Sequence, residues 1–192
     1  MKHIFLLLLI VTASSLGQTV RDINKIIGVS DSISYNNEIR IYKGFGITNG
    51  ASMVRIYEMS KDEWKAELYY YHKNEVEFTT IQLKNKRNFN YIWNDIFNTN
   101  VVYIPNQYQI EYKLVTRSKI VIENGEFGYE TTTLAISDGT SYDIFVKLDK
   151  RINHVYYSNP EAYLKHFPEV DELQSVCQLL DVVKNEFGIW KD

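Results

Sequence analysis

The sequence predicts a single α+β domain in which an antiparallel sheet packs against a C-terminal helix. Residues 63–83 show the period-two alternation of strands. Asn124-Gly125 is the strongest hairpin signal in the chain. Residues 168–187 carry apolar side chains at helical intervals of three and four. Consecutive hairpins imply antiparallel strands, because parallel strands need long crossover connections. We therefore expect a meander of hairpins, six or seven strands in all, flanked by helices.

The first third of the domain is predicted to be a helix followed by strands. Apolar residues at helical spacing indicate a short amphipathic helix over residues 19–27, which Gly28 ends. Residues 38–43 and 52–59 are typical of strands. The glycines of residues 44–50 superficially match a dinucleotide-binding fingerprint, but the third glycine is one residue late and no helix follows. A hairpin connection or a bulge accounts for them.

The hairpin over residues 63–83 has two alternative registers. If residues 73–74 form a two-residue turn, Leu68 faces Thr79. This register gathers aromatic and apolar residues on one face near the turn: Tyr69, Tyr71, Val76 and Phe78. A one-residue slip would exchange the two faces. Either the sheet is covered on both sides, or the hairpin tip packs differently from its base.

The remaining strands follow an amphipathic helix over residues 88–97, whose aromatic stripe we expect to face the core. Alternating apolar residues predict a strand over residues 109–115. Strands over residues 119–123 and 127–137 flank the Asn-Gly turn, and residues 142–148 return after a second turn.

Two helices end the chain. The pair Asn159-Pro160 is a typical helix start, and this helix should reach about residue 166. Pro168 begins the second helix, whose apolar stripe places Cys177 on the buried face and which Gly188 ends. This second helix is the clearest helical pattern in the sequence.

Residues 1–17 have the three parts of a secretory signal peptide: Lys2, an apolar run over residues 4–11, and small residues. The run is shorter than the roughly 20 residues that span a bilayer, and no later segment is apolar enough to be transmembrane. Cleavage is expected before Gln18. Because a lipoprotein needs Cys at that position, we expect no lipid anchor. Residues 18–192 should form one domain that is periplasmic or secreted.

Composition limits the partners and the compartment. Removal of residues 1–17 takes away one of 21 basic residues and none of 24 acidic residues, so the formal net charge moves from −3 to −4. With no basic block, nucleic acid is not an expected partner. The single cysteine, Cys177, permits no internal disulfide, so packing alone must hold the fold. The absence of Asn-x-Ser/Thr and the three prolines suit a bacterial protein.

No motif predicts a cofactor or a metal. His154 and His166 could converge with Asp149 or Glu161 as metal ligands, but no zinc-ligand spacing supports this, and unrelated histidines are the favoured interpretation. His72 lies far away in the sequence.

No catalytic residue is predicted either. Glu75 and Glu77 would share one face of a strand about 7 Å apart, a separation that glycoside hydrolysis could use. A solvated pair at a hairpin tip is the simpler interpretation, because nothing indicates burial or a raised pKa. Cys177 lies on an apolar stripe, where a thiol resists ionisation. These observations lean against an enzyme.

Tyrosine is abundant, with fifteen residues. Its ring and hydroxyl suit recognition of protein or carbohydrate, although half-buried strand positions explain many tyrosines equally well. We therefore expect an exported, non-catalytic binding or interaction protein that binds through Tyr69, Tyr71 and Phe78. An inhibitor-type partner of an envelope protein falls in this class. The alternative is a hydrolase acting on extracellular or envelope polymers, with Glu75, Glu77 or a histidine in its site.

Overall fold

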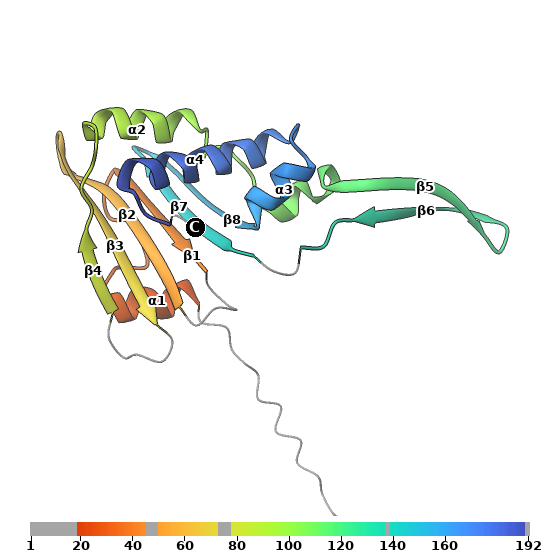
Figure 1. Ribbon diagram of the computed structural model, residues 1–192, viewed down its shortest axis with the longest axis horizontal. Helices are drawn as coiled ribbons and strands as arrows, with labels where there is room; N and C mark the ends of the chain where they lie inside the picture. The colour runs from red at the N-terminus through yellow and green to blue at the C-terminus, as the bar shows by residue number, and fades with distance from the viewer. Residues whose placement is uncertain (1–18, 45–49, 73–77, 137–138, 191–192) are drawn as a thin grey trace, which may run out of the picture.

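The structure, a computed structural model, describes residues 19–44, 50–72, 78–136 and 139–190. The predicted signal peptide lies outside these residues. The described elements are α1 (Val20–Ile27), β1 (Asn37–Lys43), β2 (Gly50–Ser60), β3 (Glu63–His72), β4 (Phe78–Gln82), α2 (Phe89–Asn98), the 3-10 helix η1 (Gln107–Lys113), β5 (Val115–Glu123), β6 (Glu126–Thr133), β7 (Ser141–Leu148), β8 (Arg151–Ser158), α3 (Pro160–His166) and α4 (Asp171–Phe187). This arrangement confirms the predicted α+β class (Figure 1).

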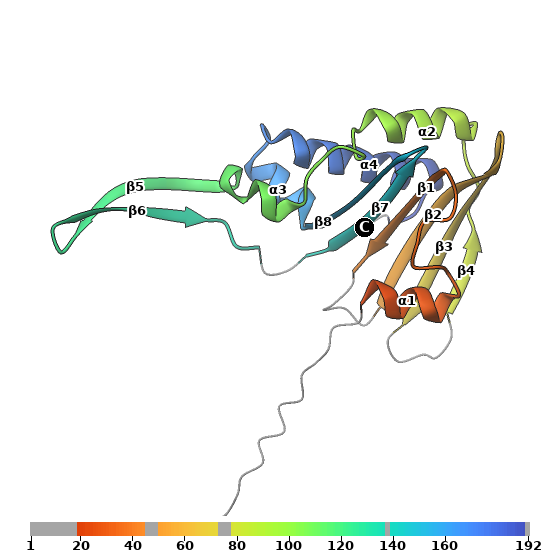
Figure 2. The same ribbon diagram turned by 180° about the vertical axis from the view of Figure 1, so that it is seen from behind.

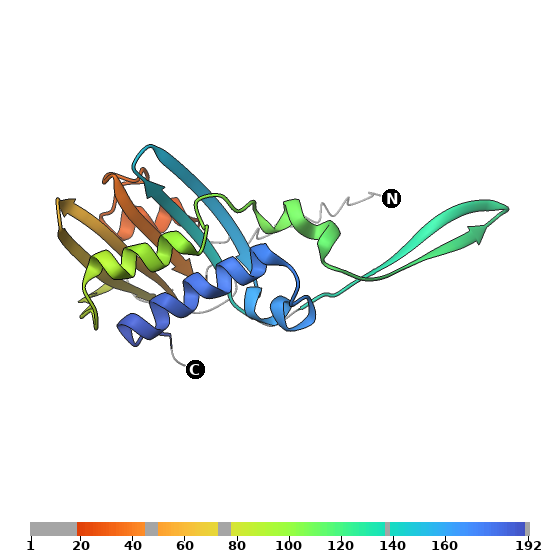
Figure 3. The same cartoon turned by 90° about the horizontal axis from the view of Figure 1, so that it is seen from above.

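Six strands form one antiparallel sheet in the order β4-β3-β2-β1-β7-β8. Helices α2 and α4 lie across one face of this sheet, as Figure 3 shows from above. Helix α1 lies on the opposite face, which Figure 2 presents to the viewer. The sheet is therefore covered on both sides, which was one of the two arrangements that the hairpin pattern allowed. Among the described residues, no helix has the length and apolar character needed to cross a bilayer.

The main core lies between the sheet and the helices α2 and α4. Apolar side chains of the sheet and of α4 that are at most 2 % exposed form its centre: Ile39, Ile41, Val54, Leu68, Leu173, Val176, Leu180 and Val183. Helix α4 ends where predicted, because Gly188 adopts the left-handed conformation at φ 66°. Cys177 is buried on the inner face of α4, as predicted.

A smaller core lies under α1. Ile23 and Ile27 of this helix pack against Tyr42, Met53 and Tyr69 of the sheet. The Thr19 hydroxyl accepts a hydrogen bond from the N–H of Asp22, and the Asp22 carboxylate accepts from the N–H of Thr19. This reciprocal capping box begins the helix at the predicted position.

The β3–β4 register differs by two residues from the pairing that a two-residue turn would give. Leu68 lies opposite Ile81, not Thr79, and Tyr71 pairs with Phe78. The predicted turn residues, Lys73 and Asn74, lie outside the described residues. Because the shift is an even number, every side chain keeps its face of the sheet.

The strand predicted over residues 109–115 is wrong for most of its length. Residues Gln107–Lys113 form the 3-10 helix η1, and the N–H of Asn106 donates to Oε1 of Gln109 at 2.9 Å. Ile110 and Leu114 are both buried. Ile110 lies within η1 and Leu114 directly after it, so a short helical turn buries both residues that the alternating pattern had assigned to a strand.

Strands β5 and β6 leave the main sheet and form a separate two-stranded hairpin, residues 115–133, which we call the arm. The predicted turn is present, with Asn124 at φ 54° and Gly125 at φ 86°. Strand β7 pairs with β1 and with β8, not with β6, and β8 was not predicted. The arm projects away from the body (Figures 1 and 3).

Candidate functional site

The predicted aromatic binding residues occupy three different environments. Tyr69 is 8 % exposed, and its hydroxyl donates to Oε2 of Glu67 at 2.7 Å. Burial raises the pKa of Tyr69, and the neighbouring Glu67 carboxylate raises it further. Phe78 is 38 % exposed, with its ring centroid 6.4 Å from that of Tyr69. The backbone of Tyr71 pairs with Phe78, but its side chain lies outside the described set. Among the described side chains of these three residues, that of Phe78 is therefore exposed at the surface.

The predicted carboxylate and histidine sites are not assembled. Glu75 and Glu77 lie outside the described residues, and so does the side chain of His72. Asp149 precedes β8, whereas Glu161 lies in α3, beyond the other end of that strand. Within the described residues, no three His, Cys, Asp or Glu side chains are placed to share a metal ion.

A groove of about 510 Å³ lies between α1 and the edge formed by β7 and β8. His154 and Asp143 line it, with Nε2 of the histidine 2.5 Å from Oδ1 of the carboxylate. The His154 ring stacks on Phe145, its cross-strand neighbour, at 3.9 Å between centroids. In the tautomer that donates from Nε2, Nδ1 is left to accept a proton. A carboxylate-oriented histidine of this kind can act as a general base.

A buried charge cluster lies on the same sheet face. Glu38 is 0 % exposed, and its Oε1 accepts from Nε of Arg40 at 2.7 Å and from Nε of Arg55 at 2.8 Å. Its Oε2 accepts from the backbone N–H groups of Ser34 and Tyr35. Burial alone would raise the pKa of Glu38, but the hydrogen bonds from Arg55 and Tyr35 and the charge of Arg40 hold it below its usual value. Because every charge has a partner, this cluster holds the strands and the preceding loop together.

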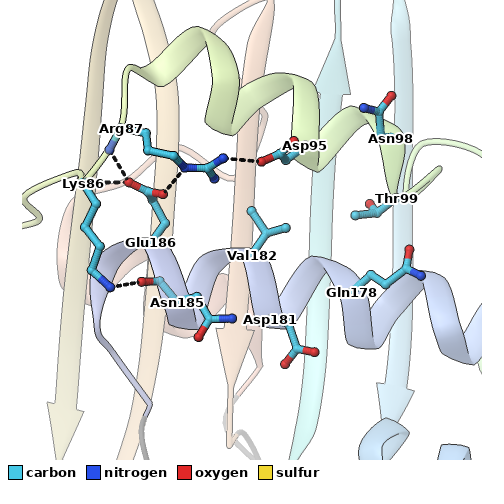
Figure 4. Close-up of a pocket in the computed structure, with 10 residues that line it drawn as sticks. All are labelled: Lys86, Arg87, Asp95, Asn98, Thr99, Gln178, Asp181, Val182, Asn185 and Glu186. Atoms are coloured by element: carbon cyan, nitrogen blue, oxygen red, sulfur yellow. Dashed lines mark hydrogen bonds and ion pairs between the residues drawn. The ribbon is translucent and has the colours of Figure 1, made fainter.

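A second groove, of about 640 Å³, lies between α2 and α4 (Figure 4). Its centre is Glu186, which is 4 % exposed and accepts from the backbone N–H groups of Lys86 and Arg87 and from Nε of Arg87. Nη1 of Arg87 also contacts Asp95 at 2.9 Å. These charged groups bind one another and join the start of α2 to the end of α4. The groove is therefore a structural junction between the two helices.

The arm presents four large and exposed apolar side chains on one face. Cross-strand neighbours at two successive positions make up this apolar face: Ile120 with Tyr129, and Ile122 with Phe127. The two isoleucines are each 65 % exposed and the two aromatic residues 81 % exposed. The opposite face carries charged pairs on either side of Val121, and Nζ of Lys119 contacts Glu130 at 2.8 Å. The arm is thus amphipathic, with its apolar side open to solvent.

The base of the arm is attached firmly to the body. Leu134, directly after β6, packs partly against the main core, and its carbonyl accepts from the hydroxyl of Tyr163 in α3 at 3.0 Å. The Asn-Gly turn predicted the hairpin but not the exposure of its apolar face. The signal available was the apolar run Ile120-Val121-Ile122 close to the Asn-Gly turn, and such a run does not show whether a strand faces the core or the solvent.

Comparison with protein-family models, with curated proteins and with solved structures found no significant match to this chain.

Proposed function

We propose that the protein is an exported, non-catalytic interaction protein and that the arm recognises its partner. The observation that carries this proposal is the apolar face of the arm, whose four large side chains are 65–81 % exposed. Single exposed apolar residues are ordinary, whereas a contiguous patch marks an interaction site. Export is proposed from the signal-peptide pattern of residues 1–17.

A protein is the partner class that the arm favours. Phe127 and Tyr129 are aromatic anchors of the kind that dominate protein interfaces. Within the described chain, neither outer edge of the two-stranded sheet pairs with another strand, so a partner strand could also add to it. A projecting hairpin suits insertion into a cleft, as an inhibitor-type partner of an envelope protein would require. Carbohydrate is the alternative ligand within the binding class.

The double variant Phe127→Asp, Tyr129→Asp is expected to reduce partner capture from envelope extract at least about 30-fold, because one aromatic hot spot contributes roughly 2 kcal/mol or more. Capture is measured by quantitative mass spectrometry with immobilised residues 18–192. Both side chains are mostly solvated, so the free energy of unfolding should change by no more than about 0.5 kcal/mol.

The opposite face of the same hairpin supplies the matched control. Lys119→Ala, Glu130→Ala removes the ion pair from the charged face and should leave capture unchanged, since an exposed pair contributes at most about 1 kcal/mol. Equal capture by the wild type and the aromatic double variant would show that the arm is not the recognition element.

A hydrolase acting on extracellular or envelope polymers is the second candidate. The specific observation in its favour is the His154–Asp143 pair in the groove beside α1. If His154 acts as a general base, His154→Gln should lower the rate of polymer cleavage by about 100-fold or more. Release of soluble fragments from labelled polysaccharide and peptidoglycan measures this rate.

His166→Gln is the control for this second candidate, because His166 lies in the last turn of α3 and does not line the groove. It should cleave at the wild-type rate. No cleavage by the wild type, or full activity of His154→Gln, would reject the hydrolase.

A further inference from the structure

The apolar face of the arm needs another surface to pack against if the hairpin is to be stable. A two-stranded hairpin alone is marginally stable in water, and stability needs additional strands or packing of its apolar face. In the described chain the arm has only its own two strands, and its apolar face is open. Another surface must therefore cover the apolar face of the arm.

The exposed area of the arm matches the requirement of a self-association interface. At 65–81 % exposure, the four apolar side chains present on the order of 500 Å² per chain, given that a buried aromatic side chain contributes roughly 150–250 Å². Two such faces packed together bury on the order of 1,000 Å² in total, which is about the threshold for a specific interface.

The charge of the arm favours protein over membrane. Glu123 and Glu126 flank the turn at the tip, so the outermost part of the arm is acidic. Anionic lipid surfaces attract basic segments and repel acidic ones. Lys119, further from the tip, is paired with Glu130, so it adds no unpaired positive charge.

The distribution of charge along the arm also selects an orientation. If two arms packed in the same direction, their acidic tips would meet, and like charges repel. If they pack in opposite directions, the two acidic tips lie far apart, at opposite ends of the paired arms. A two-fold axis across the arms then places the Ile120–Tyr129 pair of one copy over the Ile122–Phe127 pair of the other.

We propose that the apolar face of the arm packs against the same face of a second copy of this chain, with the two arms antiparallel, to form a two-fold symmetric dimer. This inference rests on the proposed function, because it names the partner of the recognition element. The two bodies lie at opposite ends of the paired arms, since each arm projects from its own body (Figure 1). A two-fold interface of this kind closes on itself and leaves no apolar face for a third copy.

Sedimentation velocity of residues 18–192 from 1 to 200 µM tests the proposal. The wild type is expected to change from monomer to dimer over this range. In Phe127→Asp, Tyr129→Asp the dissociation constant should rise at least 30-fold, because four carboxylates would enter the paired face. Lys119→Ala, Glu130→Ala should dimerise like the wild type, because that face points away from the partner.

Three results would overturn the dimer. The first is a wild-type monomer at 200 µM, and the second is a dimer that persists in the aromatic double variant. The third is flotation of the wild type with phosphatidylglycerol vesicles that the double variant loses, which would assign the face to lipid. A monomer whose capture of another protein still depends on Phe127 and Tyr129 would overturn the dimer and leave the proposed recognition role intact. Unchanged capture together with unchanged sedimentation of the double variant would overturn both.

Discussion

Glu38→Gln is expected to lower the free energy of unfolding by about 3–5 kcal/mol at pH 7, the usual effect of removing one member of a buried ion pair. Glu38 is fully buried and is the anionic partner of both Arg40 and Arg55, which are 1 % and 12 % exposed. A neutral amide leaves two guanidinium charges in the interior without a counter-ion. Denaturant unfolding followed by circular dichroism measures the change.

Glu169→Gln is the control for this substitution. Glu169 is exposed, so the same loss of one carboxylate should change the free energy of unfolding by no more than about 0.5 kcal/mol. If the two variants have equal stability, the buried cluster does not contribute to stability in the way described.

The Glu38 carboxylate also makes the free energy of unfolding depend on pH. The pKa of Glu38 is held below its usual value in the folded protein, whereas in the unfolded chain it is roughly 4.3. Between these two values the unfolded chain binds more protons, so stability rises with pH. The contribution of Glu38 is therefore complete above roughly pH 4.3 and is lost as the pH falls through the folded-state pKa. From about pH 6 to about pH 3 the wild type should lose more stability than Glu38→Gln, and equal losses would contradict the assignment.

Leu180→Ala is expected to lower the free energy of unfolding by about 2–5 kcal/mol. Leu180 is 0 % exposed in the middle of α4, where it packs in the main core against the sheet. Truncation removes buried methyl groups and leaves a cavity that the close-packed surroundings fill only in part. Thermal unfolding should show a fall in Tm of about 2–4 °C for each kcal/mol lost.

Asp181→Ala provides the comparison on the neighbouring, exposed position of the same helix. Alanine has a higher helix propensity than aspartate, so this variant should be at least as stable as the wild type, within about 0.5 kcal/mol. If Leu180→Ala were as stable as Asp181→Ala, α4 would not lie on the sheet as described.

Helices α1 and α4 were predictable because their signals are local. Helix α1 begins at the Thr19 capping box and ends at Gly28. Helix α4 has an apolar stripe and ends at Gly188. Capping groups and helical periodicity lie within one or two turns of the residues they order, so the sequence alone carries them.

The polar side of the sheet was less predictable because burial there comes from distant segments. Arg40 alternates with Ile39 and Ile41, which indicates a strand with one solvated face. In the structure the guanidinium of Arg40 donates to the carbonyl groups of Ser30 and Ser32 in the loop after α1, and that face is covered. Nothing in the alternation shows that a loop eight or ten residues away will bind the charge.

The pairing of strand β8 and the position of the arm also depend on contacts with residues distant in the sequence. In β8 the buried residues are Val155 and Tyr157, while Ile152 and Tyr156 are exposed on the other face, so the apolar residues do not alternate cleanly with polar ones. In the arm the Asn124-Gly125 turn predicts a hairpin, but the apolar run over residues 120–122 does not show whether either face meets the core. The candidate surface therefore emerged only from the arrangement of the strands.

Labelling of the single cysteine, Cys177, can report local unfolding around α4. Burial raises the pKa of the Cys177 thiol to about 12, and the carboxylates of Glu161 and Asp181 add to the shift. Only the thiolate reacts with alkylating or oxidising reagents, so in the folded state this sulfur is both covered and protonated. Its chemical modification therefore requires the segments that cover it to separate from α4. The rate of labelling of the unmodified chain then measures how often that separation occurs, without the introduction of any probe.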